Sequence, residues 1–223
     1  MPYVILIAVL LLLVGLGAYR VARRSGVTDV DLTRHLPGDN LIEEPQLVMD
    51  RAAVFQAPAV TIWPWLVQLG KDRGGWYVPA WLGRFTGKTL LSGIHRIEDQ
   101  FQRLATGDFV PDYGPGTPLF KVIALEPAQC LVYLSIRQPS ANWTWPQSES
   151  PLPSDTFALS WTLLLEETSP GQSRFYIRLR GKRQGQRASL GLFLIAGWID
   201  YVTIALLFAG LKQRLRETAA PRL

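Results

Sequence analysis

The first residues of this chain that could do chemistry are a histidine and the carboxylates near it. His95 is followed three and four residues later by Glu98 and Asp99. A histidine held by an acid can act as a general base, because the carboxylate orients the ring and stabilises its protonated form. The same spacing is typical of a surface helix with local ion pairs. We favour this second interpretation and keep His95 only as a pocket candidate.

Other arrangements with recognised chemistry are missing from the sequence. Gly87-Lys88-Thr89 resembles the end of a phosphate-binding loop, but Leu82 stands where that motif needs a glycine. A single cysteine, Cys130, excludes a disulfide scaffold and a cysteine-based zinc site, and two histidines argue against a multi-histidine metal centre. We therefore predict no catalytic set, no metal and no cofactor.

Aromatic residues are the more informative signal. The chain has eight tryptophans, and several aromatic residues gather just after residue 62. Aromatic rings with one polar tip suit the wall of a ligand pocket, and they suit core packing or an interfacial belt equally well. We leave both interpretations open. The pocket candidates are Trp65, Gln68, Trp76, Tyr77, Trp81, His95, Tyr133 and Trp161.

The elements that must position these side chains begin with a strand and a helix. Residues 47–56 predict a strand. From Pro58 onward apolar residues recur at i, i+3, i+4 and i+7, which is typical of one helical face. Pro64 lies inside this pattern and predicts a kink or two short helices. Residues 70–81 predict a loop rich in glycine and aromatic residues, and residues 94–105 a short helix or turn.

In the second half of the chain the apolar period becomes two, which predicts antiparallel strands in hairpins. Apolar residues alternate with Arg178 and Arg180 in the last strand, so we expect these arginines on the solvent side. Residues 188–216 predict a long final helix. This order predicts an α+β fold in which a helix lies across a curved antiparallel sheet. The predicted strands are 108–111, 119–125, 131–136, 157–167 and 173–183.

A stretch of 18 uncharged residues, 2–19, follows Met1. It is just long enough for a helix to cross the hydrocarbon core of a membrane. A cleaved signal peptide is the alternative, but such a peptide needs basic residues before it and a small-residue cleavage site after it. We therefore interpret residues 2–19 as an uncleaved transmembrane anchor. The arginines that follow, Arg20, Arg23 and Arg24, then hold the C-terminal side in the cytoplasm.

Charge and apolar residues are unevenly distributed along the chain. Hydrophobic residues make up 48% of it, which rules out a disordered protein, and they concentrate in residues 3–19 and 188–211. Basic residues follow both blocks and account for the net charge of +5, so the body between them is close to neutral. This pattern favours a membrane surface as partner and argues against nucleic acid. The predicted anchor with its basic flank, linker, body domain and tail are residues 1–24, 25–45, 46–217 and 218–223.

Several stretches of sequence together resemble the START/Bet v 1-like superfamily, also described as SRPBCC or polyketide cyclase/dehydrase-like. The similarity covers about residues 36–217. It implies a helix-grip fold, in which a curved antiparallel sheet wraps around the C-terminal helix and leaves a hydrophobic cavity between them. It implies no single reaction, since the fold hosts many functions. The stretches are Leu36–Asp39, Ile62–Gly70, Arg73–Tyr77, Gly107–Asp108, Asp200–Val202 and Gly210–Arg214.

The final helix departs from the pattern of that superfamily, because residues 188–211 hold a single charge, Asp200. As a core helix it would leave an apolar outer face, which could meet the membrane or a second copy of the chain. As a second membrane span it would bury Asp200 at a cost of about 2.5–3.5 kcal/mol and remove the helix that the sheet needs. We favour the core helix.

Together these features predict a single-pass protein of the cell membrane with its soluble domain in the cytoplasm. The domain would bind a lipid or another hydrophobic small molecule, and we lean toward binding rather than catalysis. One alternative is a cyclase/dehydrase-type enzyme in which Tyr77, His95 or Gln68 moves protons. Another is a non-catalytic, membrane-associated interaction module. A homodimer through the apolar C-terminal helix is also open.

Overall fold

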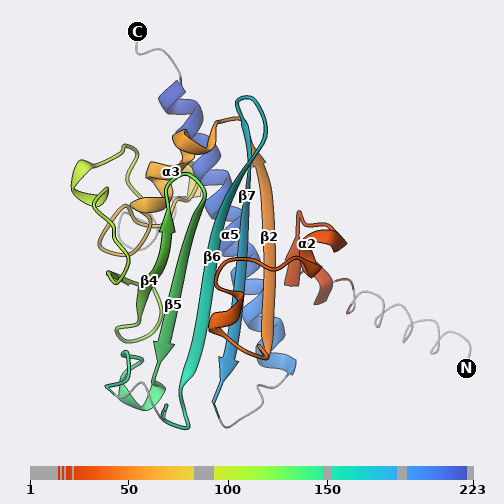
Figure 1. Cartoon of the computed structure of the whole chain (residues 1–223), viewed down its shortest axis with the longest axis vertical. Helices are drawn as coiled ribbons and strands as arrows, with labels where there is room; N and C mark the ends of the chain where they lie inside the picture. The colour runs from red at the N-terminus through yellow and green to blue at the C-terminus, as the bar shows by residue number, and fades with distance from the viewer. Residues whose placement is uncertain are drawn as a thin grey trace, which may run out of the picture.

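One long helix lies along the inner face of an antiparallel sheet in the computed structural model (Figure 1). The structure describes residues 15, 17, 19–21, 23–82, 93–147, 152–184 and 190–219, the last range without the side chains of 190–194. The predicted anchor therefore lies almost entirely outside the described residues. The α+β helix-grip plan predicted from the sequence is confirmed.

The described strands form one sheet in the order β1-β2-β7-β6-β5-β4-β3. All neighbours are antiparallel except β1 and β2, which run parallel. The strands are β1 (Arg24–Ser25), β2 (Leu47–Phe55), β3 (Phe109–Pro111), β4 (Leu119–Glu126), β5 (Cys130–Arg137), β6 (Phe157–Ser169) and β7 (Gln172–Arg183). The helices are α2 (Asp29–Thr33), α3 (Ala59–Val67) and α5 (Leu190–Ala219), with short 3-10 turns η1 (Asp39–Leu41), η2 (Asp99–Phe101) and η3 (Pro139–Ala141).

The predicted strands and the long final helix are present with shifts of a few residues. The short helix or turn predicted over 94–105 is reduced to η2, a single 3-10 turn. In α3, Pro64 is tolerated within the helix, which ends at Val67. Because β2 pairs with β7, the first long strand lies beside the last one, and the segment after α3 lies on the β4 side of the sheet (Figure 1).

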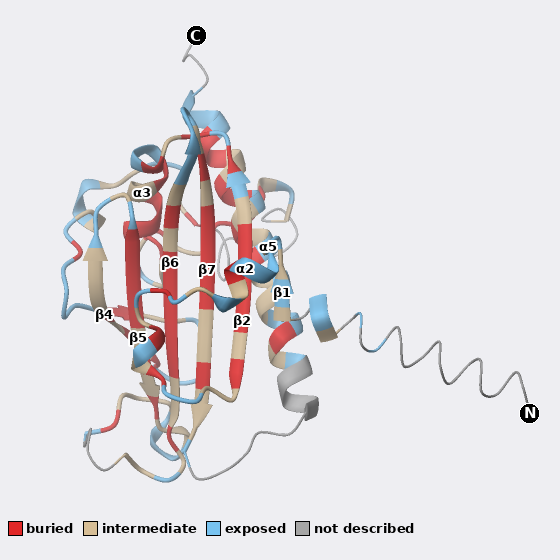
Figure 2. Cartoon of the chain, turned by 45° about the vertical axis from the view of Figure 1, so that its right-hand side comes forward, coloured by how far each residue is buried: buried red, intermediate tan, exposed pale blue. Residues whose placement is uncertain are grey.

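The core lies between the sheet and α5, where aromatic rings interlock. Phe208 of α5 contacts Phe55 of β2 and Phe175 of β7, with ring centroids 5.8 and 5.4 Å apart. Leu207 and Leu211 of α5 are fully buried. Each such side chain contributes about 1.5–3 kcal/mol on burial. Figure 2 shows the buried residues running along β5, β6 and β7.

Asp200, the single charged residue between residues 188 and 211, forms an ion pair inside this core. Arg51, on the inner face of β2, is 1% exposed, and its Nη2 lies 2.9 Å from Asp200 Oδ2. Burial raises the pKa of Asp200 to about 6, against the opposing effect of Arg51. Residues Ile195–Ala219 are long and apolar enough to cross a membrane, but they occupy the position of the core helix against the sheet.

The outer face of the sheet carries a second buried network, around Arg178. This arginine is 3% exposed and donates to Asp50 at 2.7 Å and to Asp39 at 2.9 Å. Its predicted place on the solvent side is wrong, because residues 28–42 cover this face. Arg180 is partly covered as well and donates to the Ile42 carbonyl at 3.1 Å.

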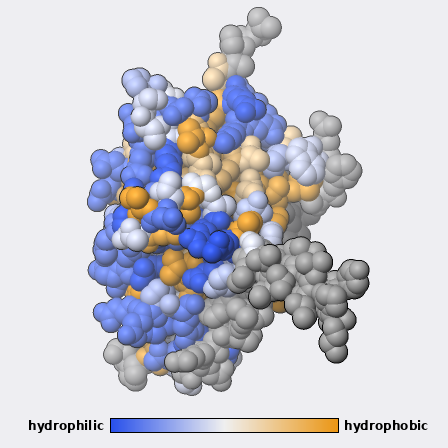
Figure 3. All heavy atoms as spheres, turned by 90° about the vertical axis from the view of Figure 1, so that its right-hand side faces the viewer, coloured by the Kyte–Doolittle hydropathy of each residue, from blue (hydrophilic) through white to orange (hydrophobic). Residues whose placement is uncertain are grey.

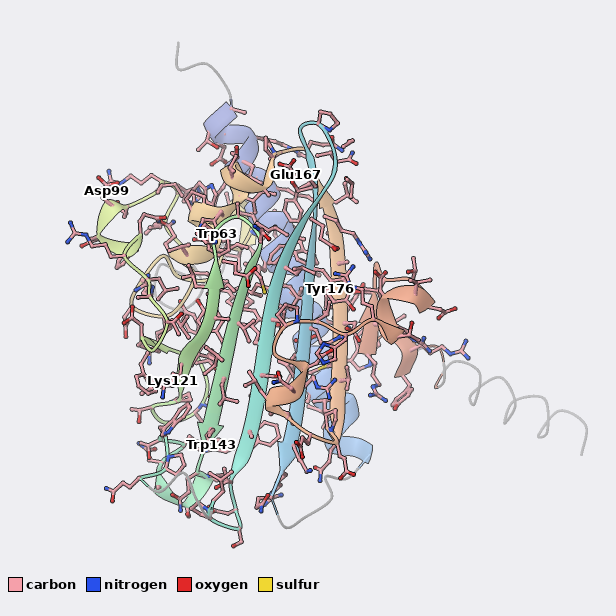
Figure 4. All side chains as sticks on the ribbon, in the orientation of Figure 1. Trp63, Asp99, Lys121, Trp143, Glu167 and Tyr176 are labelled. Carbon is pink, nitrogen blue, oxygen red and sulfur yellow. The ribbon has the colours of Figure 1, made fainter. Side chains whose placement is uncertain are left out.

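Residues 25–45, predicted as a linker, pack on the outer face through α2 and η1. Leu36 is buried against Ala52 and Tyr176. Figure 4 labels Tyr176 on β7, next to α2. Thr28 is the N-cap of α2 and forms a capping box with Asp31. The Asp31 carboxylate also accepts hydrogen bonds from both Nη atoms of Arg174, each at 2.7 Å. The Arg174 guanidinium holds the pKa of Asp31 far below its ordinary value of 3.8.

We predict that Asp31→Asn removes an acid-sensitive part of the stability. The folded-state pKa of Asp31 lies below the unfolded value of 3.8, so its contribution is fully present above the unfolded pKa and is lost as the pH falls through the folded-state pKa. At neutral pH the free energy of unfolding of the variant should be about 1.5–3 kcal/mol lower, which is the usual contribution of a hydrogen bond to a charged group. Urea unfolding of the full chain in detergent across this pH range measures both quantities.

The matched control is Asp29→Asn. The Asp29 side chain is fully exposed, and its ion pair with Arg24 is long, at 3.6 Å. It should leave the pH profile of the wild type unchanged. If Asp31→Asn retains the wild-type dependence on acid, the ion pair with Arg174 does not stabilise the outer face.

We also predict that Arg51→Met lowers the free energy of unfolding by about 3–5 kcal/mol, because it leaves Asp200 buried without its partner. The double variant Arg51→Met/Asp200→Leu should recover most of this loss, since an apolar pair of similar volume replaces the ions. Denaturant unfolding of the two variants and of the exposed control Arg103→Met tests the pair. Equal losses in the single and double variants would show that the ions are not coupled.

Candidate functional site

Four aromatic residues from four segments meet on the inner face of the sheet. Trp76 from the loop after α3 stacks on Trp161 of β6, with centroids 5.9 Å apart and planes 19° apart. Tyr133 of β5 stacks on the same indole at 6.0 Å and 27°. Phe120 of β4 contacts both Tyr133 and Trp161 at 5.8 Å. We call these four residues the aromatic cluster.

A small cavity of about 20 Å³ lies beside the aromatic cluster. Leu69, Val110 and Tyr113 close it from the loop after α3 and from β3. A water molecule needs roughly 10–15 Å³, so the space holds about one water. Drug-sized ligands occupy pockets of about 300–1,000 Å³, so such a ligand needs the cavity to widen.

Two of the aromatic residues that line this cavity, Trp161 and Tyr133, also carry a polar group. Trp161 Nε1 is buried and has no hydrogen-bond partner among the described residues. Burial raises the pKa of the Tyr133 hydroxyl above its ordinary value. A buried donor without an acceptor costs about 1–3 kcal/mol.

Trp76 is half-buried and links the cavity to the C-terminal helix. Its Nε1 donates to the Thr203 carbonyl of α5 at 3.0 Å. The loop that carries Trp76 is closed at its base by hydrogen bonds between Gly70 and Gly75, where Gly70 adopts a φ of +136° that favours glycine. Trp76 is therefore the most exposed member of the aromatic cluster and covers the other three rings on the solvent side.

Trp65 and Tyr77 form a separate, locked pair. The Tyr77 hydroxyl donates to the Trp65 carbonyl at 2.7 Å, and the two rings meet edge to face at 5.5 Å. The Arg214 guanidinium stacks on the Tyr77 ring at 4.8 Å and donates to carbonyls that include Gly93 and Val78. These contacts fix the segment after α3 to α5.

Gln68 is fully buried and organises the segment around η2. Its Nε2 donates to the Arg96 carbonyl at 3.2 Å, and its Oε1 accepts from the Glu98 backbone at 3.1 Å. Gln102 Nε2 donates to the same oxygen at 3.3 Å. The Gln68 amide is therefore hydrogen-bonded to the backbone of the segment around η2, and Gln68 does not line the cavity.

His95 and Trp81 lie at the surface. His95 Nδ1 is 3.3 Å from Glu217 Oε2, an exposed pair between the loop and α5. The Trp81 side chain is 58% exposed. The structure thus brings Trp76, Tyr133 and Trp161 together and places the other five candidates elsewhere. Gln68 and Tyr77 are buried and bonded to backbone carbonyls, whereas His95 is exposed, so these three side chains do not line the cavity beside the aromatic cluster.

Phe120 is the member of the aromatic cluster that the sequence analysis missed. Its place on the inner face follows from the two-residue period of β4, which buries Phe120 and Val122 together. Among the described residues no group of three or more histidine, cysteine or carboxylate side chains is placed to hold a metal ion.

Comparison with known proteins concerns the fold alone. No protein-family model and no curated protein matches the chain. Similar solved structures include XoxI from Bacillus cereus, with a TM-score of 0.45, 9% identity and coverage of 78% of this chain and 99% of that chain. Ara h 8.0201, of the Bet v 1-like type, has a TM-score of 0.43, 12% identity and coverage of 76% and 97%.

A third similar structure is protein MLL2253 from Mesorhizobium loti, with a TM-score of 0.41, 18% identity and coverage of 78% and 99%. At such identities and scores the similarities carry no information on what this chain binds. The class that the structure itself defines is a helix-grip domain, a sheet with a long C-terminal helix.

We predict that Gln68→Leu lowers the free energy of unfolding by about 1–3 kcal/mol, because it leaves the partly buried Glu98 N–H without its acceptor. Amide exchange at Glu98 should accelerate together with this loss. His95→Gln is the control, since the exposed His95 pair contributes at most about 1 kcal/mol. Unchanged exchange at Glu98 in Gln68→Leu would contradict the structural role assigned to Gln68.

Proposed function

We propose that this chain is a membrane-tethered helix-grip domain that binds a hydrophobic molecule carrying a hydrogen-bond acceptor. The observation that carries the proposal is the cavity walled by the aromatic cluster, whose member Trp161 has a buried Nε1 without a hydrogen-bond partner among the described residues. Flat aromatic walls suit an apolar body, and the indole N–H suits one carbonyl or carboxylate oxygen at its end. The ligand would be a lipid or a similar hydrophobic small molecule.

The binding space differs from the one that the sequence resemblance implied. Against β2 and β7, the inner face of α5 is packed by Phe55, Phe175 and Phe208. The proposed ligand enters instead under the loop after α3, where Trp76 is the cover. Because Trp76 is half-buried and held by stacking and one hydrogen bond, its outward rotation widens the cavity at modest cost.

The tether rests on the sequence of residues 2–19, whose uncharged length matches a membrane span. Arg20, Arg23 and Arg24 follow it and favour a cytoplasmic domain. Carbonate extraction of membranes that contain the full chain should leave it in the pellet, whereas a chain that starts at Arg20 should leave the membrane more readily.

We predict that Trp161→Phe weakens binding of a fluorescent long-chain fatty acid about two- to tenfold, because it removes one hydrogen bond and keeps the aromatic wall. The measurement is a fluorescence titration of the full chain in mild detergent, beside mass spectrometry of lipids that co-purify with it. The matched control is Trp198→Phe, at an exposed position on α5. If the wild type binds no probe and carries no lipid, ligand binding at this site is excluded.

A second candidate, a non-catalytic interaction module, is favoured by one observation. Ile195, Trp198, Ile199 and Val202 follow the spacing i, i+3, i+4 and i+7 on α5 and are 39–61% exposed. This apolar stripe, with the nearly filled core, fits a helix that docks another surface. Light scattering of the full chain and of Ile199→Ser tests a homodimer through it. A monomeric wild type would exclude the homodimer.

A further inference from the structure

A second hollow lies where the N-terminal segment reaches the outer face of the sheet. Its volume is about 310 Å³, and five arginines line it: Arg20, Arg23, Arg24, Arg178 and Arg180. The first three come from the end of the predicted anchor, and the last two come from β7. We call this space the arginine hollow. The side of the molecule turned to the viewer in Figure 3 carries strongly hydrophilic and hydrophobic side chains next to one another.

The anchor end is attached to the sheet by specific contacts. Arg24 and Ser25 form β1, which pairs with Asp50 and Arg51 of β2. Arg23 Nε donates to the Val48 carbonyl at 3.2 Å. The position of the arginine hollow relative to the sheet is therefore set by backbone pairing, and its arginines come from segments far apart in the sequence.

The positive charge of the hollow exceeds the negative charge available to it. Asp50 is the carboxylate in its lining, and it already accepts from Tyr176 at 2.5 Å and Arg178 at 2.7 Å. Among the described residues, Arg20 and Arg23 have no carboxylate partner. At least two guanidinium charges thus remain uncompensated.

Arg180 adds an observation that points to an anionic ligand. Its Nη1 is 3.5 Å from Asp39, while its buried Nε has no hydrogen-bond partner among the described residues. Guanidinium groups present paired donors that match the oxygens of a phosphate, and such charged hydrogen bonds are among the strong ones. A phosphate in the hollow would instead meet the guanidinium groups of Arg20 and Arg23, which have no carboxylate partner among the described residues.

The place of the hollow selects the source of the phosphate. Arg20, Arg23 and Arg24 directly follow residues 2–19, so in a tethered chain they lie at the headgroup level of the cytoplasmic leaflet. We propose that the arginine hollow binds the phosphate of an anionic phospholipid headgroup and so holds the sheet against the membrane. The proposal rests on the membrane tether and is independent of the ligand in the aromatic cavity. A free phosphate ion has the same chemistry and is separated from the lipid by the test.

The test uses the full chain in nanodiscs of phosphatidylcholine with or without phosphatidylglycerol, followed by native mass spectrometry of retained lipid. The wild type should retain phosphatidylglycerol in preference to phosphatidylcholine. Arg20→Gln/Arg24→Gln should reduce this retention about 30-fold, at roughly fivefold for each arginine near the surface. The control Arg103→Gln/Arg216→Gln removes the same charge at exposed positions outside the hollow and should retain the lipid.

Equal retention by the hollow variant and the wild type would overturn the site. Binding of inorganic phosphate to the detergent-solubilised chain, without preference for phosphatidylglycerol in nanodiscs, would overturn the lipid as its source. Carbonate extraction separates this result from failure of the tether. A chain that leaves the membrane fails as a tethered protein, whereas a chain that stays without lipid preference fails only at the hollow.

Discussion

The packing of one helix on the inner face of the sheet is the constraint on which the structure depends. An antiparallel sheet with an apolar face needs a cover, and α5 supplies it with side chains between Ile204 and Leu215. Phe208, Leu207 and Leu211 provide the apolar contact, and Arg51 pairs with Asp200, a carboxylate that would otherwise be buried alone. A helix apolar enough to cross a membrane is thereby used as the core of a domain.

The outer face follows a different principle. Arg178 and Arg174 draw the carboxylates of residues 28–42 onto the sheet, so that a segment with few apolar residues still covers it. Buried ion pairs of this kind define one geometry more than they add net stability, since each ion loses its hydration. The geometry they define places the end of the predicted anchor beside β2 and β7. The two faces of the sheet thus separate an apolar cavity from an arginine-rich hollow.

The candidate site shows why fold and function must be argued separately here. The helix-grip plan is compatible with carriers, enzymes and interaction modules. What distinguishes them is side-chain geometry. Trp76, Tyr133 and Trp161 line one small cavity, and the buried Trp161 Nε1 has no hydrogen-bond partner among the described residues. Gln68 and Tyr77, by contrast, donate hydrogen bonds to backbone carbonyls. The arrangement therefore favours binding over proton transfer.

The fold class and the order of the elements could be predicted from the amino-acid pattern, because the apolar period changes from helical to alternating at recognisable points. Three members of the aromatic cluster were among the predicted pocket residues. The pattern could not distinguish them from Trp81, because Trp76 and Trp81 lie close together in sequence and the path of the loop sets which of them points inward. The burial of Arg178 and the choice between a core helix and a membrane span for α5 became clear in three dimensions. Both depend on which distant segments lie opposite a side chain, and a local pattern does not contain that information.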